Sequence, residues 1–308
     1  MKYSFLFLFF FINLSFRTSP SGNKAIYGED DRIELFEFFD LKEKTFWKST
    51  ALIVNSNEII KTGQQNVSLV TKNFGKKYNL CSDQPHLEQR VAGRCTGFLI
   101  SDNHLVTAGH CIKSDAECQD TYFVFDFSVD DDYQNDLSLV ATKNLRRCSR
   151  VVVSEYDPEL NRDYAVVELD TPISERIPFE LSYIKAPPVD RELIAVGNPM
   201  GLPTKVSLNG IAREEATVRS CRLGQKCPPT IVSDKYFSLD IEAFGGSSGS
   251  PVIDKTTEKV VGILVRGGAD FVTTKHEETE CRKLVVCSGD CGGEDVIFLN
   301  PIKEILEK

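Results

Sequence analysis

The sequence has little positive charge for its size. Its 308 residues include 36 lysines and arginines against 45 aspartates and glutamates, so the formal net charge at pH 7 is −9. A chain with this charge balance attracts neither nucleic-acid phosphates nor an anionic membrane surface. We therefore expect neither nucleic acid nor a membrane among its partners. The length suits one large domain or two medium ones.

The sequence also lacks an apolar run long enough to span a bilayer, which takes about 20 residues. Near the N-terminus, an apolar block covers Phe5 to Ile12, follows Lys2, and gives way to Asn13 and Ser15. A positive start, a short apolar block and a polar exit are typical of a secretory signal peptide. We predict a signal peptide over residues 1–20 and a secreted protein, extracellular or periplasmic, with an uncleaved anchor as the alternative.

The ten cysteines lack the spacing of a zinc site. Cys281, Cys287 and Cys291 are not paired across two residues, and no histidine follows them. An even number of cysteines in an exported chain favours disulfides instead. We therefore expect no metal and no other cofactor. Two pairs lie close together along the chain and are candidate bridges: Cys118–Cys148 and Cys221–Cys227.

Short apolar runs separated by turns every eight to twelve residues dominate the chain, without an evident internal repeat. This pattern is typical of an all-β sandwich or barrel. Residues 174–189 contain three prolines and little periodicity, so we interpret them as a linker between two halves. The final residues, 302–308, have apolar side chains at helical spacing and predict a short C-terminal helix.

One turn between two apolar runs has the sequence Gly245-Gly246-Ser247-Ser248-Gly249-Ser250-Pro251. Because Gly246 and Gly249 carry no side chains, the backbone can bend sharply there and leave Ser248 exposed beside outward N–H groups. Such a turn can supply both a nucleophile and an oxyanion hole. The alternative interpretation is a flexible Gly/Ser hairpin.

A serine nucleophile needs a base, and the chain has only four histidines: His86, His104, His110 and His276. Only His110 ends an apolar strand within a turn of small residues, and Cys111 follows it directly. A Cys95–Cys111 disulfide would tie together the far ends of the predicted hairpin over residues 95–111. That bridge would also fix the backbone beside the imidazole.

An acid that orients the histidine is the third requirement. Asp163 lies where the polar turn Asn161-Arg162 becomes an apolar strand over residues 164–169. An aspartate entering a core needs a hydrogen-bond donor, and a histidine N–H is one such donor. A capping or turn role for Asp163 is the alternative.

Three blocks, taken in order, resemble the signature blocks of the trypsin-like (chymotrypsin-fold) serine peptidases: Thr107–Cys111, Asp163–Val167 and Gly246–Pro251. The Ser-Gly-Ser-Pro ending of the third block is similar to the bacterial glutamyl endopeptidase branch. The segments Tyr27–Arg32 and Val196–Pro203 also resemble that branch.

This resemblance implies two antiparallel six-stranded β-barrels with the active site in the crevice between them. On this basis, residues 21–173 are expected to form an N-terminal segment and the first barrel, which carries His110 and Asp163. Residues 174–190 would be the linker. Residues 191–308 would form the second barrel, which carries Ser248, and the C-terminal helix.

The resemblance also implies a monomeric serine endopeptidase that hydrolyses polypeptides through an acyl-enzyme. Ser248 would attack the scissile carbonyl, His110 would carry the proton, and Asp163 would orient the imidazole. The backbone N–H groups of Gly246 and Ser248 would form the oxyanion hole. The alternative is a catalytically inactive homologue that acts as a binding module. The presence of all three candidates favours the enzyme.

Two positions depart from the family pattern. Ser247 stands where trypsins have an aspartate that pairs with the freed N-terminus, so we expect an oxyanion hole that does not depend on an inserted ammonium. Glu242, six residues before Ser248, stands where trypsins keep the acid that selects basic side chains. It favours cleavage after Lys or Arg, unless its side chain points away from the pocket.

Cleavage after glutamate is poorly supported, because glutamyl endopeptidases have hydroxyl residues and a histidine where this chain has Ala243 and Leu264. Arg266 acts against a preference for basic residues, since it would neutralise Glu242 or attract acidic side chains. It belongs to a segment that is expected to pair with the substrate backbone. The expected substrate-binding residues are Glu242, Ala243, Val265, Arg266 and Gly267.

Overall fold

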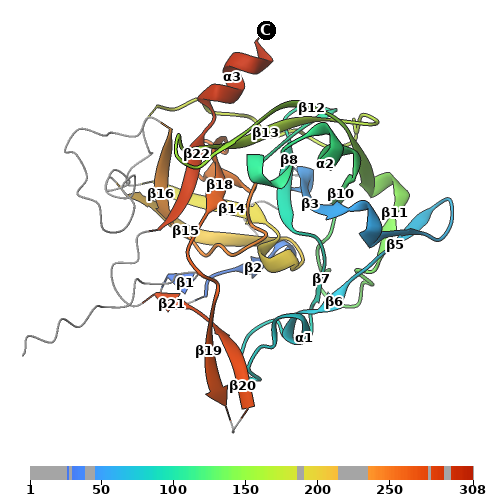
Figure 1. Cartoon of the computed structure of the whole chain (residues 1–308), viewed down its shortest axis with the longest axis vertical. Coiled ribbons are helices and arrows are strands. Elements are labelled where there is room, and N and C mark those ends of the chain that lie inside the picture. The colour runs from blue at the N-terminus through green and yellow to red at the C-terminus, as the bar shows by residue number, and fades with distance from the viewer. Residues whose placement is uncertain are drawn as a thin grey trace, which may run out of the picture.

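The computed structural model describes residues 26–27, 30–38, 46–185, 191–213, 235–276, 279–287 and 293–307. The predicted signal peptide, the candidate pair Cys221–Cys227 and Cys291 lie outside these residues. Figure 1 shows two β-rich halves side by side, with the helix α3 (Asn300–Leu306) projecting from one end. None of the helices in the described ranges has the length and apolar character needed to cross a membrane.

The first half is a closed antiparallel barrel of six strands, in the order β10-β12-β13-β9-β8-β3. Aromatic and β-branched residues fill it because such side chains pack well on a pleated surface. Phe98, Phe123 and Val166 are all fully buried. The strands are β3 (Thr50–Asn55), β8 (Cys95–Leu99), β9 (His104–Thr107), β10 (Thr121–Phe125), β12 (Leu145–Asp157) and β13 (Arg162–Leu169).

The second half is also closed, because β14 pairs with β15 as well as with β17. Its order is β14-β17-β18-β22-β16-β15, and β2 (Ile33–Glu34) adds a short extra strand to β15. The strands are β14 (Glu192–Gly197), β15 (Lys205–Arg213), β16 (Tyr236–Asp240), β17 (Pro251–Asp254), β18 (Val260–Arg266) and β22 (Glu294–Phe298). The all-β prediction, with two six-stranded barrels and a C-terminal helix, is confirmed.

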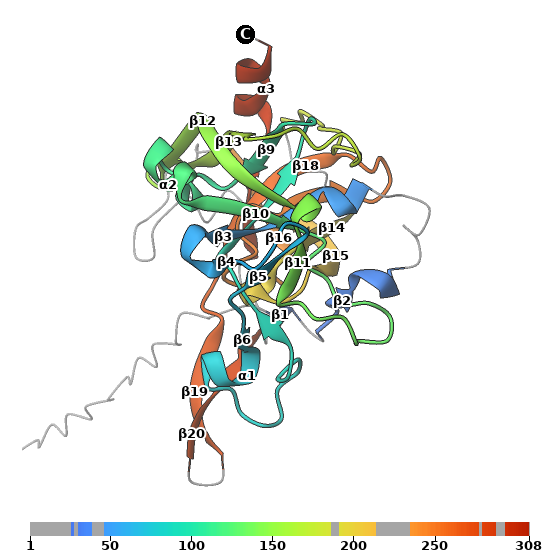
Figure 2. The ribbon, with the colours of Figure 1, turned by 90° about the vertical axis from the view of Figure 1, so that its right-hand side faces the viewer.

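Smaller elements decorate the barrels. The hairpin formed by β19 and β20 projects from the end opposite α3, with α1 beside it, in both Figures 1 and 2. The N-terminal β1 runs parallel to β21. These elements are β1 (Ile26–Tyr27), β4 (Ile59–Lys61), β5 (Asn66–Leu69), β6 (Lys72–Asn73), β7 (Arg90–Val91), β11 (Leu139–Ala141), β19 (Phe271–His276), β20 (Thr279–Leu284), β21 (Val286–Cys287), α1 (Phe74–Tyr78) and α2 (Asp115–Gln119).

Three disulfides join described residues. Cys95–Cys111 closes the hairpin of β8 and β9, and Cys118–Cys148 ties α2 to β12, which confirms both predicted pairs. The third bridge, Cys81–Cys281, joins cysteines 200 positions apart and fastens β20 to the segment after α1. Spacing along the chain gives no indication of such a distant pairing.

Candidate active site

His110 lies in the 3₁₀ turn η5 (Gly109–Cys111), directly after β9. Gly109 allows this turn to press against the first barrel: a Cβ on Gly109 would lie 2.0 Å from the carbonyl oxygen of Glu155. The disulfide at Cys111 holds the other side of the turn. The imidazole is therefore fixed at the barrel surface, with 28% of its side chain exposed.

Asp163 is completely buried at the start of β13 and faces His110. Its Oδ1 accepts a hydrogen bond from the His110 backbone N–H at 3.0 Å. The ring atom Nδ1 lies 3.1 Å from Oδ1 and 2.9 Å from Oδ2. A carboxylate only accepts hydrogen bonds, so Nδ1 carries the proton and Nε2 of the neutral imidazole is left as an acceptor.

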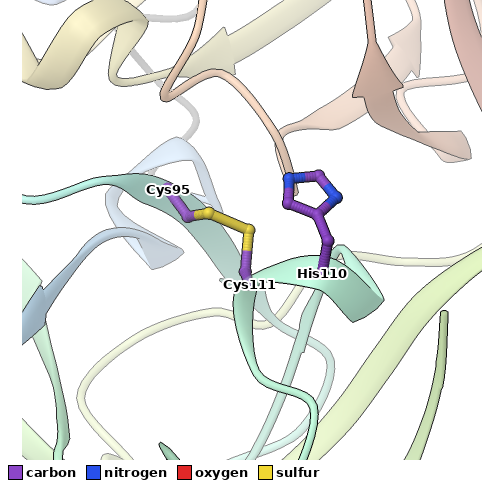
Figure 3. A group of neighbouring side chains, drawn as sticks. All are labelled: Cys95, His110 and Cys111. Atoms are coloured by element: carbon purple, nitrogen blue, oxygen red, sulfur yellow. A yellow bond between two sulfur atoms is a disulfide. The ribbon is translucent and has the colours of Figure 1, made fainter.

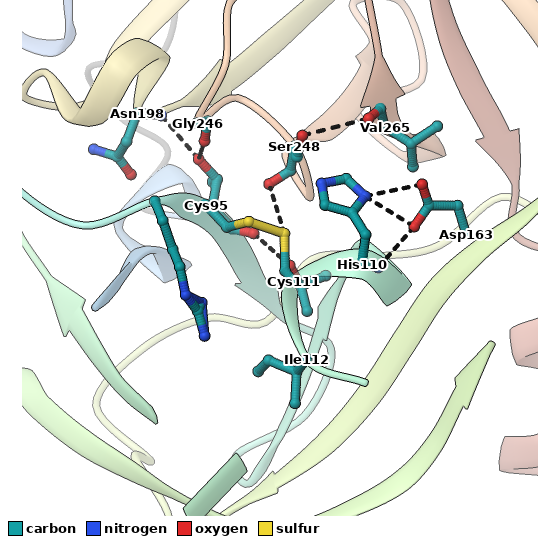
Figure 4. Close-up of a disulfide and its surroundings, with 12 residues drawn as sticks. Cys95, His110, Cys111, Ile112, Asp163, Asn198, Gly246, Ser248 and Val265 are labelled. Carbon is teal, nitrogen blue, oxygen red and sulfur yellow. Dashed lines mark hydrogen bonds and ion pairs between the residues drawn. A yellow bond between two sulfur atoms is a disulfide. The ribbon is translucent and has the colours of Figure 1, made fainter. Parts of the chain in front are cut away.

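Ser248 lies in the turn between β16 and β17. Gly249 has φ +91°, and a Cβ there would lie 2.0 Å from the carbonyl oxygen of Thr96, so the turn requires glycine at this position. Figure 4 shows the His110 ring between Asp163 and Ser248. Among the described contacts, the Ser248 hydroxyl donates to the Val265 carbonyl at 3.3 Å, and no hydrogen bond joins it to His110.

Gly246, the other predicted oxyanion donor, has φ +94°. It sits in a tight turn in which the Ser247 N–H donates to the Phe244 carbonyl at 2.9 Å. Within the described part of the chain, neither the Gly246 nor the Ser248 N–H donates to another backbone carbonyl. Ser247, which replaces the aspartate of trypsins, lies buried, with its hydroxyl 3.4 Å from the Phe244 nitrogen.

A cavity adjoins Ser248, and four of the five expected substrate-binding residues line it: Ala243, Val265, Arg266 and Gly267. Glu242 is not among the lining residues. Two carboxylates that the sequence did not single out, Asp270 and Glu294, do line the cavity. They lie far from the Gly-Ser turn in the chain, and no local motif marks them.

The side chain of Glu242 is buried and faces the N-terminal segment, where its Oε1 accepts a hydrogen bond from the Tyr27 N–H at 3.1 Å. Burial, together with the hydrogen bond and the negative charge of Asp31, raises the pKa of Glu242 to about 9. Glu242 is therefore protonated at neutral pH and adds no charge to the cavity.

Arg266 does not pair with Glu242, in contrast to one sequence-based expectation. Its guanidinium binds the Asp295 carboxylate at 3.1 Å, and these two residues face each other across β18 and β22. The Asp295 carboxylate, which is not part of the cavity lining, therefore compensates most of the positive charge of Arg266.

The two lining carboxylates lie close to the backbone of the cavity wall. Both oxygens of Asp270 accept from the Gly245 N–H at 3.1 Å. Burial raises the pKa of Asp270, and this hydrogen bond and the Arg282 charge oppose the rise. Glu294 is buried and accepts from the Tyr27 hydroxyl at 3.1 Å. A Cβ on Gly267 would lie 1.6 Å from Glu294 Oε2, so only glycine permits this approach.

Cys95, His110 and Cys111 also form a compact group whose potential ligand atoms lie within 4.8 Å of one another. Figure 3 shows that the two sulfur atoms are bonded to each other. A metal-binding cysteine must be a thiolate, so these two residues serve as a structural brace beside His110.

Two closed barrels with a histidine–aspartate pair and a serine turn between them define a chymotrypsin-like fold. A family model described as trypsin-like peptidase domain matches residues 95–263, which is more than half of the chain. The chain therefore belongs to the family of trypsin-like peptidase domains.

The chain is similar to a secreted RxLR effector protein, number 73, of Plasmopara viticola, with 28% identity over 182 residues. The match covers 56% of this chain and 41% of the relative, so the chain spans about two fifths of that protein. A solved Glu endopeptidase is 14% identical, with a TM-score of 0.49 and coverage of 92% of this chain and 97% of the other. An inactivated protease paralogue of the scabies mite is 12% identical, with a TM-score of 0.49 and coverage of 85% and 94%.

Proposed function

We propose that this protein is a secreted serine endopeptidase in which Ser248, His110 and Asp163 act together. The observation that carries the proposal is the pairing of His110 Nδ1 with the fully buried Asp163 carboxylate. This pairing leaves Nε2 as a proton acceptor on the side of the ring where Figure 4 draws Ser248.

In the proposed reaction, rotation about the Cα–Cβ bond of Ser248 moves its hydroxyl from the Val265 carbonyl towards His110 Nε2. The serine oxygen attacks the scissile carbonyl carbon while Nε2 takes the hydroxyl proton. The imidazolium that forms is stabilised by Asp163. The negative charge on the substrate oxygen is met by the N–H groups of Gly246 and Ser248.

The tetrahedral intermediate then collapses to an acyl-enzyme as His110 donates its proton to the leaving amine. A water molecule repeats the sequence: His110 takes a proton from it, the hydroxide adds to the acyl carbon, and Ser248 leaves as its hydroxyl form. Each proton removed by the histidine is returned in the following step, so no cofactor is consumed.

An inactive homologue that binds polypeptides is the second candidate, and the Ser248 hydrogen bond to Val265 is the observation that favours it. Labelling with a fluorophosphonate probe distinguishes the two functions, because the probe reacts only with an activated serine. We expect one adduct per chain, located on Ser248 by peptide mass mapping. A folded protein that takes up no probe would identify a binding module.

We propose that the cavity beside Ser248 selects Lys or Arg side chains, through Asp270 and Glu294 rather than Glu242. A basic side chain entering this cavity would meet two carboxylates, while the Arg266 charge is compensated by Asp295. Hydrogen bonds between a cation and a carboxylate are stronger than those between neutral groups.

Glu294→Gln is expected to lower kcat/KM for peptides with Arg before the cleaved bond by about 10- to 100-fold, the usual effect of losing a charged hydrogen bond. Glu242→Gln is the matched control: it makes the same chemical change at a carboxyl that is already protonated at pH 7. Digestion of a peptide library with each variant measures both effects. Equal losses in the two variants, or no excess of Lys and Arg with the wild type, would contradict this specificity.

The proposal includes export from the cell. The predicted signal peptide and the three disulfides joining described residues support it, because such bridges persist in oxidising compartments.

A further inference from the structure

Thr96 is a fully buried residue of β8 in the first barrel that bonds to two segments of the second barrel. Its backbone N–H donates to the Ser248 carbonyl at 2.8 Å. Its hydroxyl accepts from the Asn198 N–H at 2.9 Å and lies 3.0 Å from the Gly246 carbonyl oxygen. One side chain therefore contacts both the serine turn and the segment after β14.

The direction of these hydrogen bonds follows from the chemistry of a hydroxyl. Asn198 can only donate through its N–H, so the Thr96 oxygen accepts there. The single hydroxyl hydrogen is then directed to the Gly246 carbonyl, which can only accept. The Asn198 N–H is buried and Gly246 is half-buried, and the Thr96 hydroxyl satisfies the two backbone groups together.

The two peptide groups that flank Gly246 are both held by their carbonyl oxygens. Thr96 holds the Gly246 carbonyl, and the Met200 N–H donates to the Gly245 carbonyl at 2.5 Å. A trans peptide places its N–H opposite its C=O, and no cis peptide bond is present in the described residues. The Gly246 N–H therefore points away from Met200, out of the loop.

The turn that presents the Met200 N–H begins at Asn198. Met200 has φ 54°, a left-handed conformation that non-glycine residues adopt at a cost, so surrounding contacts must maintain it. The Tyr78 hydroxyl donates to the Met200 carbonyl at 3.1 Å, and the Gly201 N–H donates to the Asn198 carbonyl at 3.0 Å. The Thr96 hydroxyl holds the first residue of this turn through the Asn198 N–H.

We propose that Thr96 is a positioning residue for the oxyanion hole. Its hydroxyl holds the Gly246 carbonyl directly and, through the Asn198 N–H, the turn whose Met200 N–H holds the Gly245 carbonyl, so that the Gly246 N–H faces the position of the substrate carbonyl oxygen. The inference rests on the proposed peptidase function and extends it, because it makes the oxyanion hole depend on contact between the barrels. Position 246 also requires glycine, because a Cβ there would lie 2.8 Å from the Asn198 carbonyl oxygen.

The test compares Thr96→Val, which keeps the shape and removes the hydroxyl, with Thr96→Ser, which keeps the hydroxyl. Thr96→Val is expected to lower kcat for a peptide amide about tenfold or more with KM nearly unchanged, because a misplaced donor weakens transition-state binding selectively. Affinity for a peptide boronic acid inhibitor should fall in parallel. Thr96→Ser should restore both values to near wild type.

Thr50→Val is the matched control. Thr50 is a buried threonine of the same barrel, and its hydroxyl has no hydrogen-bond partner among the described residues. The chemical change is identical, so a general effect of removing a buried hydroxyl would appear in both variants. Thr50→Val should leave kcat and inhibitor affinity unchanged. If Thr96→Val does not fold, Thr96→Ala takes its place in the same comparison.

Hydrogen exchange gives a reading that does not require turnover. Thr96→Val should speed amide exchange in a peptide covering residues 197–202, where the Asn198 and Met200 N–H groups are held, and Thr50→Val should not. An inactive wild type that still shows this contrast would contradict the proposed function but support the role of Thr96 in positioning the loop. The role is overturned if exchange is unchanged, or if wild type and Thr96→Val turn over substrate equally well.

Discussion

A Ser248→Ala variant is expected to lose about a millionfold in kcat for peptide hydrolysis while keeping the wild-type fold, as removal of a serine nucleophile does in enzymes of this mechanism. Without the hydroxyl no acyl-enzyme forms, and the histidine–aspartate pair has no proton to accept. Release of peptides from casein, measured beside near-UV circular dichroism, checks both parts of the expectation.

Ser250→Ala is the matched control for this experiment. Ser250 lies two positions further along the same turn, and its buried hydroxyl has no hydrogen-bond partner within the described residues. Removing it leaves the proposed chemistry in place, so activity should stay close to wild type. Near-wild-type hydrolysis by Ser248→Ala, or equal losses in the two variants, would refute the assignment of Ser248.

Asp163→Asn is expected to lower kcat about ten-thousandfold with little change in KM. An asparagine whose oxygen accepts from the His110 N–H would turn its NH₂ group towards Nδ1. The imidazole would then carry its proton on Nε2 and could not accept one from Ser248. Steady-state kinetics on a peptide p-nitroanilide measure the loss.

Asp157→Asn provides the comparison. Asp157 lies at the end of β12, and among the described residues its side chain accepts hydrogen bonds from the nearby N–H groups of Glu159 and Leu160. We expect no loss of kcat in this variant. A loss of less than about tenfold in Asp163→Asn would mean that the carboxylate does not set the tautomer of His110.

The parts of the molecule that the sequence predicted are those encoded by neighbouring residues. Short runs of apolar residues between turns predicted an all-β sandwich or barrel, and the resemblance of three short blocks to the trypsin-like peptidases implied two barrels. The small residues before His110 predicted a tight turn that the Gly109 contact with Glu155 explains. The burial of Asp163 followed from its place at the entrance to an apolar strand. In each case the sequence signal that the prediction used lies beside the residue in the chain, although the contact with Glu155 comes from a distant strand.

The parts that the sequence did not reveal depend on contacts between distant segments. Glu242 faces Tyr27, and burial and Asp31 keep its carboxyl uncharged. Both Tyr27 and Asp31 lie far from Glu242 in the chain. Asp270 and Glu294 reach the cavity from separate elements. The roles of these side chains are set by which segments meet around the cavity of the second barrel, and local patterns carry no information about that.

The central claim is that Ser248, His110 and Asp163 act as one unit, and a double variant tests it most directly. If Asp163 works only through the proton transfer from Ser248, adding Asp163→Asn to Ser248→Ala removes nothing further, so kcat of the double variant should equal that of Ser248→Ala. A further loss in the double variant, approaching the product of the two single effects, would show that the residues act independently and would contradict the account.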